Sequence, residues 1–245
     1  MPRPIRAVLF DLGETLVHLN KPWQEVFQLE VNALYQYLNG AGVKTRFQEF
    51  SNIFTREFED ATSKANSQHV ETPIEEIMSR VLVKSGVRIP CDAFLQGAIE
   101  EFYRPEIESW QLDPDTLEVL ANLENKYLLG LISNAKSEWQ VKSILAKFQL
   151  ERFFKIILIS ASLRVRKPRP DIFLKALDSL NITPDEAIFV GNSLDADMAG
   201  ARGVGIRSIH LRKDSSIRES SIDPEAAVSS LSQVAKIVND WSNGT

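Results

Sequence analysis

Short apolar runs alternate with helical stretches over most of the chain. The runs have the length of strands that are buried on both faces of a sheet. They lie at residues 5–10, 128–133, 154–160, 187–191 and 207–211. Apolar residues at helical spacing predict helices near residues 115–125, 137–148, 170–180, 195–202 and 231–241. Repeated strand and helix units predict a parallel sheet with right-handed crossovers.

The region from residue 21 to residue 104 has a different pattern, with apolar positions at helical spacing and no comparable apolar runs. Helices are predicted around residues 23–38, 47–58, 74–85 and 91–103. The phenylalanines of this region are expected to pack against one another. We therefore predict an α/β fold, a Rossmann-like parallel sheet formed by residues 1–20 and 105–245, with an all-helical insert at residues 21–104.

The composition excludes several classes of protein. The net charge is −5, with 28 basic and 33 acidic residues well mixed, which gives no reason to expect a nucleic acid as partner. Cys91 is the one cysteine, so no internal disulfide forms, and His18, His69 and His210 are too scattered for a zinc site. The N-terminal apolar run is too short for a membrane span or a signal sequence. The cytoplasm is the expected location, as a monomer or homodimer.

Polar residues stand where the predicted strands end. Asp11 follows the first run, Ser133 and Asn134 end the second, and Asn192 follows the fourth. Lys167 lies in the loop after the third run. Ligands of parallel sheets bind outside the carboxyl ends of the strands. These residues are therefore the candidates for a functional site.

Four strand-end segments occur in a fixed order around the helical insert: FDLGETL, LISNAK, RKPRPDIF and FVGNSLDADMAGA. Each segment alone is weak evidence. Together they strongly resemble the motifs of the haloacid dehalogenase superfamily over the core from residue 5 to about residue 211. The resemblance implies a Rossmann-like core with a mobile helical cap inserted after the first strand. It also implies a hydrolase that catalyses phosphoryl transfer or, less often, dehalogenation.

The resemblance assigns expected roles to individual residues. Asp11 resembles the aspartyl nucleophile, and Ser133 resembles the hydroxyl that holds a transferring phosphoryl oxygen. Lys167 resembles the cation that joins nucleophile and substrate, while Asn134 and Thr15 are expected beside the substrate. The expected substrate is a small phosphorylated metabolite.

A magnesium ion is the cofactor that the resemblance implies. A carboxylate that attacks a phosphate dianion meets charge repulsion, which fixed cations and a metal offset. Mg²⁺ prefers hard oxygen ligands. The expected ligands are the Asp11 carboxylate, the Gly13 carbonyl, Asn192 and Asp197.

The sequence departs from the family pattern at two of these positions. Gly13 replaces the usual second aspartate of the first motif, and a glycine has no acid to protonate a leaving group, a role worth about 10²- to 10⁴-fold. Turnover is therefore expected to be slow unless another group, such as Glu14 or His18, substitutes. Asn192 replaces the usual first acid of the fourth motif. An amide in place of a carboxylate is expected to weaken Mg²⁺ binding.

Two alternatives to a phosphatase stay open. The first is a metal-independent 2-haloacid dehalogenase, in which Asp11 attacks carbon. Phe173 stands against it, since those dehalogenases have a tyrosine at that spacing, and Gly13 lacks their aromatic residue. The second is a catalytically silent protein that binds a phosphorylated ligand.

The third motif lies in a basic loop, RVRKPR. Arg164 stands where the family commonly has glycine. Arg166 and Arg169 are interpreted as solvated side chains. A cationic rim near the nucleophile would nevertheless attract anionic substrates.

Overall fold

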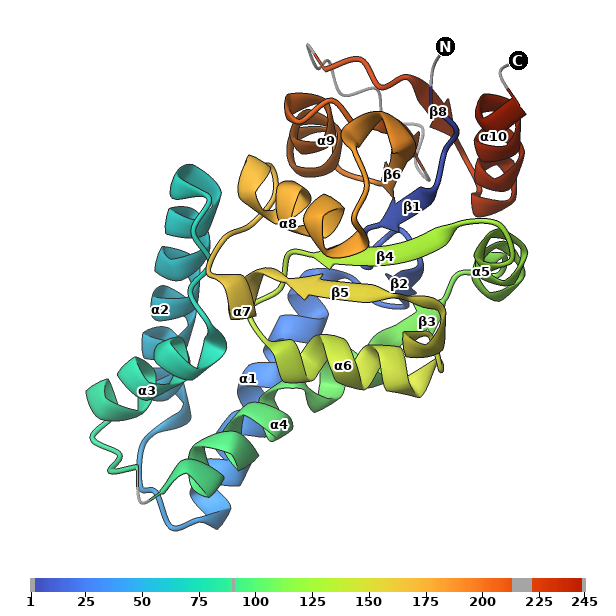
Figure 1. Ribbon diagram of the computed structural model, residues 1–245. Helices are drawn as coiled ribbons and strands as arrows, with labels where there is room; N and C mark the ends of the chain where they lie inside the picture. The colour runs from blue at the N-terminus through green and yellow to red at the C-terminus, as the bar shows by residue number, and fades with distance from the viewer. Residues whose placement is uncertain (1–2, 90, 213–221, 244–245) are drawn as a thin grey trace.

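The structure is a computed structural model that describes residues 3–89, 91–212 and 222–243. Its main sheet has six strands in the order β5-β4-β1-β6-β7-β8, all paired in parallel (Figure 1). The strands are β1 (Ala7–Phe10), β4 (Leu128–Ser133), β5 (Ile156–Ile159), β6 (Ala187–Gly191), β7 (Arg207–Leu211) and β8 (Ala226–Val228). The Rossmann-like α/β prediction is confirmed. The short strand β8 was not predicted, because three residues carry too little pattern.

Helices cover both faces of this sheet. One hydrophobic cluster joins Val8 and Phe10 of β1 to helices α5 (Thr116–Glu124), α6 (Glu138–Lys147) and α10 (Leu231–Asn243). A second cluster joins Ala7 and Leu9 to helices α8 (Pro170–Leu180) and α9 (Ala199–Gly203). Successive strand residues point to opposite faces, so an apolar β1 serves both layers.

Four helices lie between β2 (Val17–Leu19) and β3 (Trp110–Leu112), which form a separate antiparallel pair. They are α1 (Trp23–Gly40), α2 (Phe47–Gln68), α3 (Ile74–Lys84) and α4 (Asp92–Ser109), and Figure 1 shows them projecting from one side of the sheet layer. They share a hydrophobic cluster of their own, which includes Phe50, Phe54 and Phe102. The four predicted helices are therefore present, whereas the β2–β3 pair was not predicted. The insert boundaries at residues 21 and 104 stay a prediction.

The prediction that the last of these helices ends at residue 103 was wrong. Helix α4 continues through Pro105 to Ser109. Proline removes one helical hydrogen bond. The buried face of α4 nevertheless runs on through Phe102, Tyr103 and Glu106, and this packing outweighs the local effect of the proline.

The remaining elements are short. Helix α7 (Ser160–Leu163) follows β5, so the strand predicted to reach residue 160 ends at Ile159. Two 3₁₀ turns lie at Glu151–Phe153 and Pro184–Glu186. A π-helical turn, Leu194–Met198, precedes α9 and takes the first part of the helix predicted at 195–202. In the part of the chain that the structure describes, no helix combines the length and apolarity needed to cross a bilayer.

Candidate active site

Asp11 lies directly after β1, in the middle of the sheet. Its backbone N–H donates to the carbonyl of Val190 at the end of β6, with an N···O distance of 2.9 Å. The Thr15 hydroxyl donates to Asp11 Oδ2 at 3.2 Å. Asp11 is 8% exposed and Thr15 is fully buried. The turn after β1 therefore fixes the carboxylate, and Thr15 orients it.

Lys167 reaches Asp11 from the loop between α7 and α8. Its Nζ lies 2.6 Å from Asp11 Oδ1, 2.7 Å from the carbonyl oxygen of Ile132 and 2.7 Å from Asp197 Oδ1. The ammonium group is almost completely buried. The expected pairing of Lys167 with Asp11 is thus present in the structure.

Asn134 holds the backbone of Lys167 in place. Its Nδ2 donates to the Lys167 carbonyl at 3.0 Å, and its Oδ1 accepts from the Lys167 N–H at 2.9 Å. An amide has two N–H donors, so one remains for a ligand. Asn134 also lines the cavity in front of Asp11, and its contact with substrate stays a prediction.

Asp197 is placed by the π-helical turn after β6. Its Oδ2 accepts from the Ser193 N–H at 3.0 Å, and its Oδ1 forms the ion pair with Lys167. A Cβ atom on Gly191 would lie 2.4 Å from Asp197 Oδ2. Glycine at the end of β6 therefore leaves room for this carboxylate. The contacts support Asp197 as an anchor for Lys167, and its role as a metal ligand stays a prediction.

Burial and the neighbouring charges shift the pKa values of Asp11 and Lys167. Burial raises the pKa of Asp11 to about 6, although Lys167 opposes this effect and Asp197 adds to it. Burial alone would lower the pKa of Lys167, but the Asp11 and Asp197 carboxylates outweigh it and raise that pKa. Lys167 therefore stays an ammonium group between two carboxylates.

A cavity of about 440 Å³ opens in front of Asp11 and Ser133. Its walls come from the sheet edge, the basic loop and the helical insert. The insert contributes Trp23, Phe58, Thr62, Glu71, Tyr103 and Glu106. Phe58 thus lines the cavity as well as packing within the insert. Asp11 and Ser133 therefore line one cavity, whose volume is sufficient for a small molecule.

Glu71 connects the insert to the core beside this cavity through hydrogen bonds and an ion pair. It is 2% exposed, and its carboxylate accepts from Lys136 Nζ at 3.1 Å and from the Ser160 hydroxyl at 2.9 Å. Arg166 forms an ion pair with it at 3.4 Å. Arg166 is largely buried, so its interpretation as a solvated side chain was wrong. Sequence reasoning missed both Glu71 and Lys136. Glu71 lies in no motif, and Lys136 ends the segment LISNAK but was given no role.

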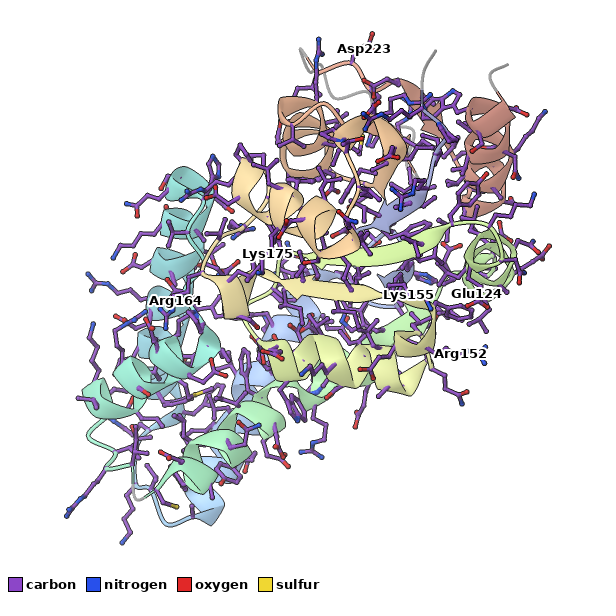
Figure 2. All side chains as sticks on the ribbon, viewed as in Figure 1. Glu124, Arg152, Lys155, Arg164, Lys175 and Asp223 are labelled. Carbon is purple, nitrogen blue, oxygen red and sulfur yellow. The ribbon has the colours of Figure 1, made fainter. Side chains whose placement is uncertain are left out.

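Of the other arginines of the basic loop, Arg164 is exposed and Arg169 is partly exposed. Arg164 pairs with Glu76 of α3, and Figure 2 labels Arg164 on the side of the molecule where the helical insert lies. Its φ is +56°, in the left-handed region that favours glycine. Glycine, which the family pattern was expected to have at this position, would adopt this conformation without strain. Arg169 pairs with Asp171 at the surface, as expected for a solvated side chain.

Trp110 occupies the space next to Gly13. A Cβ atom on Gly13 would lie 3.3 Å from Trp110 Cη2. Gly13 has no positive φ, so the backbone itself allows a side chain. Glu14, a possible substitute acid, accepts from the Leu19 N–H, and His18 lies in β2. Only Glu14 of these two lines the cavity.

Three of the four residues expected to bind magnesium, Asp11, Gly13 and Asn192, offer a carboxylate, a carbonyl and an amide oxygen at the ends of the adjacent strands β1 and β6. The carboxylate of the fourth, Asp197, pairs with Lys167. These are hard donors that suit Mg²⁺. In the described residues, no group of three or more His, Cys, Asp or Glu side chains gathers in a metal-binding arrangement. The Asn192 carbonyl contacts His210 Nε2 at 2.9 Å, which fixes the backbone at this position. The donor set fits a magnesium site with one charged ligand.

The family is shown by comparison of the sequence. Residues 8–211 match the haloacid dehalogenase-like hydrolase family, and the chain belongs to it. The predicted resemblance is confirmed. A glyceraldehyde 3-phosphate phosphatase of Pyrococcus abyssi is 32% identical over 206 residues, which are 84% of this chain and 80% of that protein.

A second relative and a solved structure are also similar to this chain. A glyceraldehyde 3-phosphate phosphatase of Methanopyrus kandleri is 26% identical over 212 residues, covering 85% of this chain and 84% of that protein. The crystal structure of a 2-haloacid dehalogenase from Pseudomonas syringae has a TM-score of 0.73 and 23% identity, covering 97% of this chain and 99% of that chain. At this identity, the structural likeness is a likeness of fold.

Proposed function

We propose that the protein is a phosphatase that acts on a small phosphorylated metabolite through a phosphoryl group carried on Asp11. The observation that carries this proposal is the Asp11 carboxylate, held between Thr15 and Lys167 at the end of a cavity. Relatives named as phosphatases support the reaction class.

The reaction proceeds by in-line displacement at phosphorus. An oxygen of Asp11 attacks, the bond to the leaving alcohol breaks, and water then releases phosphate from Asp11. Lys167 offsets the negative charge that Asp11 and substrate bring together. Ser133, in the cavity wall, donates its hydroxyl to a phosphoryl oxygen. Asp11, Lys167 and Ser133 are themselves buried, and low exposure to water strengthens their charge interactions.

Magnesium is part of the proposal. Asp11, the Gly13 carbonyl and Asn192 would hold it, and Asp197 would act through Lys167. When bound, it neutralises charge on the equatorial phosphoryl oxygens.

The test is phosphate release from a panel of phosphorylated metabolites and one aryl phosphate, with and without Mg²⁺. We expect slow, Mg²⁺-stimulated release that Asp11→Asn abolishes. Asp178→Asn, at an exposed position of α8, is the matched control and keeps full activity. Full activity in Asp11→Asn would exclude the mechanism.

The two alternatives predict other results in the same assay. A dehalogenase releases halide from a 2-haloacid in the presence of a chelator. Phe173, where those enzymes have tyrosine, is fully buried against Phe189 and offers no hydroxyl. A silent binding protein binds a phosphorylated ligand without turnover. The cytoplasmic location and the monomer or homodimer also stay predictions.

A further inference from the structure

One buried carboxyl group lies at the wall of the cavity without a cation, and a second carboxyl group is its neighbour. Glu106 of α4 is 3% exposed and lines the cavity that contains Asp11. Glu30 of α1 is fully buried behind it. Among the described residues, neither forms an ion pair. A buried carboxylate without a cation is costly, so a structural role alone explains this pair poorly.

Glu106 is held in one orientation. Trp110 Nε1 donates to its Oε1 at 3.2 Å, and Gln140 Nε2 donates to its Oε2 at 2.5 Å. The far edge of the same indole ring lies against Gly13. Glu106 is therefore connected through one ring to the position where the family pattern has an acid and this chain has none.

Glu30 has no hydrogen-bond donor for either oxygen in the part of the chain that the structure describes. The group that acts on its ionisation is the Glu106 carboxyl. Two carboxyl groups that face each other form a hydrogen bond only when they share a proton. Burial raises the pKa of Glu30 well above its ordinary value, and Glu106 adds to this effect. Glu30 is thus the protonated partner.

We propose that Glu106 is the general acid and base of the phosphoryl transfer, in place of the aspartate that the family pattern has at Gly13. Glu30 is a positioning residue that shares a proton with Glu106. This inference rests on the proposed function and adds a catalytic residue to it.

The proton balance closes over the two steps. As Asp11 forms its bond to phosphorus, the bond to the leaving oxygen breaks and that oxygen takes the proton of Glu106. In the second step the Glu106 carboxylate takes a proton from the water that attacks phosphorus, and the Asp11 carboxylate is released. The products are an alcohol and phosphate, and Glu106 ends protonated.

The titration of Glu106 suits this role. Burial raises its pKa to about 7, while hydrogen bonds involving Glu30, Trp110 and Gln140 oppose the shift. Tyr103 on the same helix stays neutral, because burial and the nearby acids raise its pKa. The acids that raise the pKa of Tyr103 also include Glu71, which precedes α3, and Glu75, in the first turn of α3. Both forms of Glu106 are therefore present near neutral pH, as an acid–base catalyst needs.

The experiment compares phosphate monoesters whose leaving alcohols differ in acidity, using kcat/KM in the presence of Mg²⁺. An alkyl leaving group needs a proton in the transition state, whereas an acidic aryl leaving group does not. We expect Glu106→Gln to lower kcat/KM for alkyl phosphates by about 100-fold or more and to change it little for aryl phosphates. Glu100→Gln, on the same helix, is the matched control, and its kcat/KM should be unchanged for both alkyl and aryl phosphates.

The outcomes that overturn this proposal are distinguishable from those that overturn the proposed function. An equal loss for both substrate types, or no loss, excludes Glu106 as the acid, while Asp11-dependent release still supports the phosphatase. Absence of any Asp11-dependent phosphate release excludes both the role of Glu106 and the phosphatase itself. If Glu106→Gln does not fold, the unaltered protein is used. Its kcat/KM for an alkyl phosphate then falls above about pH 7 while that for an aryl phosphate does not, and identical profiles overturn the proposal.

Discussion

The ammonium group of Lys167 lies 2.6 Å from Asp11 Oδ1, although 156 positions separate the two residues in the chain. Asp197 lies on the other side of the same Nζ atom. One cation thus pairs with two buried carboxylates, which lie in the segments that follow the adjacent strands β1 and β6. The position of the proposed nucleophile depends on this ion triad.

Lys167→Met should remove both stability and activity. It leaves Asp11 and Asp197 buried without a cation, which costs about 3–5 kcal/mol of unfolding free energy. We expect kcat/KM to fall by about 10²- to 10³-fold or more. Urea unfolding and phosphate release measure the two effects, and Lys175→Met, at an exposed position of α8, is the control. Normal activity of Lys167→Met would show that Lys167 has no part in the mechanism.

Restoring the family's aspartate at Gly13 should not raise turnover. The sequence alone suggests Gly13→Asp as the direct way to regain a general acid. Trp110 stands 3.3 Å from the Cβ position, however, so the new side chain displaces the indole ring. We expect Gly13→Asp to lower both the unfolding free energy and kcat. Trp110→Phe combined with Gly13→Asp should recover part of the loss, and a single variant faster than the unaltered protein would contradict this account.

Glu71→Gln should destabilise the protein. The substitution leaves Lys136 and Arg166 without their buried carboxylate, at a cost of about 3–5 kcal/mol. Glu76→Gln is the matched control, because Glu76 also pairs with an arginine of the basic loop but is exposed. The control should change the unfolding free energy by about 0.5 kcal/mol or less. Equal effects of the two substitutions in urea unfolding would mean that the Glu71 pairs contribute no more than surface pairs.

Stability should depend on pH through Glu106. Its pKa rises from the ordinary 4.5 to about 7 on folding, so the folded state binds more protons. The stabilisation is complete below pH 4.5 and is lost as pH rises through 7. We therefore compare the change in unfolding free energy that Glu106→Gln causes at two pH values. This change should be more favourable at about pH 8.5 than at about pH 4.5, by about 2–3 kcal/mol. Urea unfolding at both pH values measures this, and an identical effect at both would contradict the raised pKa.

Asn192→Asp should strengthen magnesium binding. It replaces a neutral amide ligand by a carboxylate, and ligand charge tunes affinity for hard cations. We expect the Mg²⁺ concentration for half-maximal phosphate release to fall by roughly tenfold. Asn125→Asp, an exposed position after α5, is the control. An unchanged Mg²⁺ requirement would exclude Asn192 as a ligand.

The sequence was sufficient for the sheet and for the residues at its strand ends. Buried strands and amphipathic helices leave a periodic pattern over many positions, so this pattern alone predicts that Asp11, Ser133 and Lys167 meet at one edge of the sheet. Elements with only three residues, β2, β3 and β8, leave no such pattern. The course of α4 through Pro105 was also missed, because tertiary packing outweighed a local signal.

The sequence by itself determined the family, the fold and the order of the four motifs, because these depend on local patterns and on residue types at strand ends. Only the tertiary structure decided that Trp110 fills the space beside Gly13, that Glu71 joins the insert to the core, and that Glu106 faces the cavity. Each of these contacts joins separate elements. Burial and distance, which set the charge state of such groups, arise only when those elements pack together.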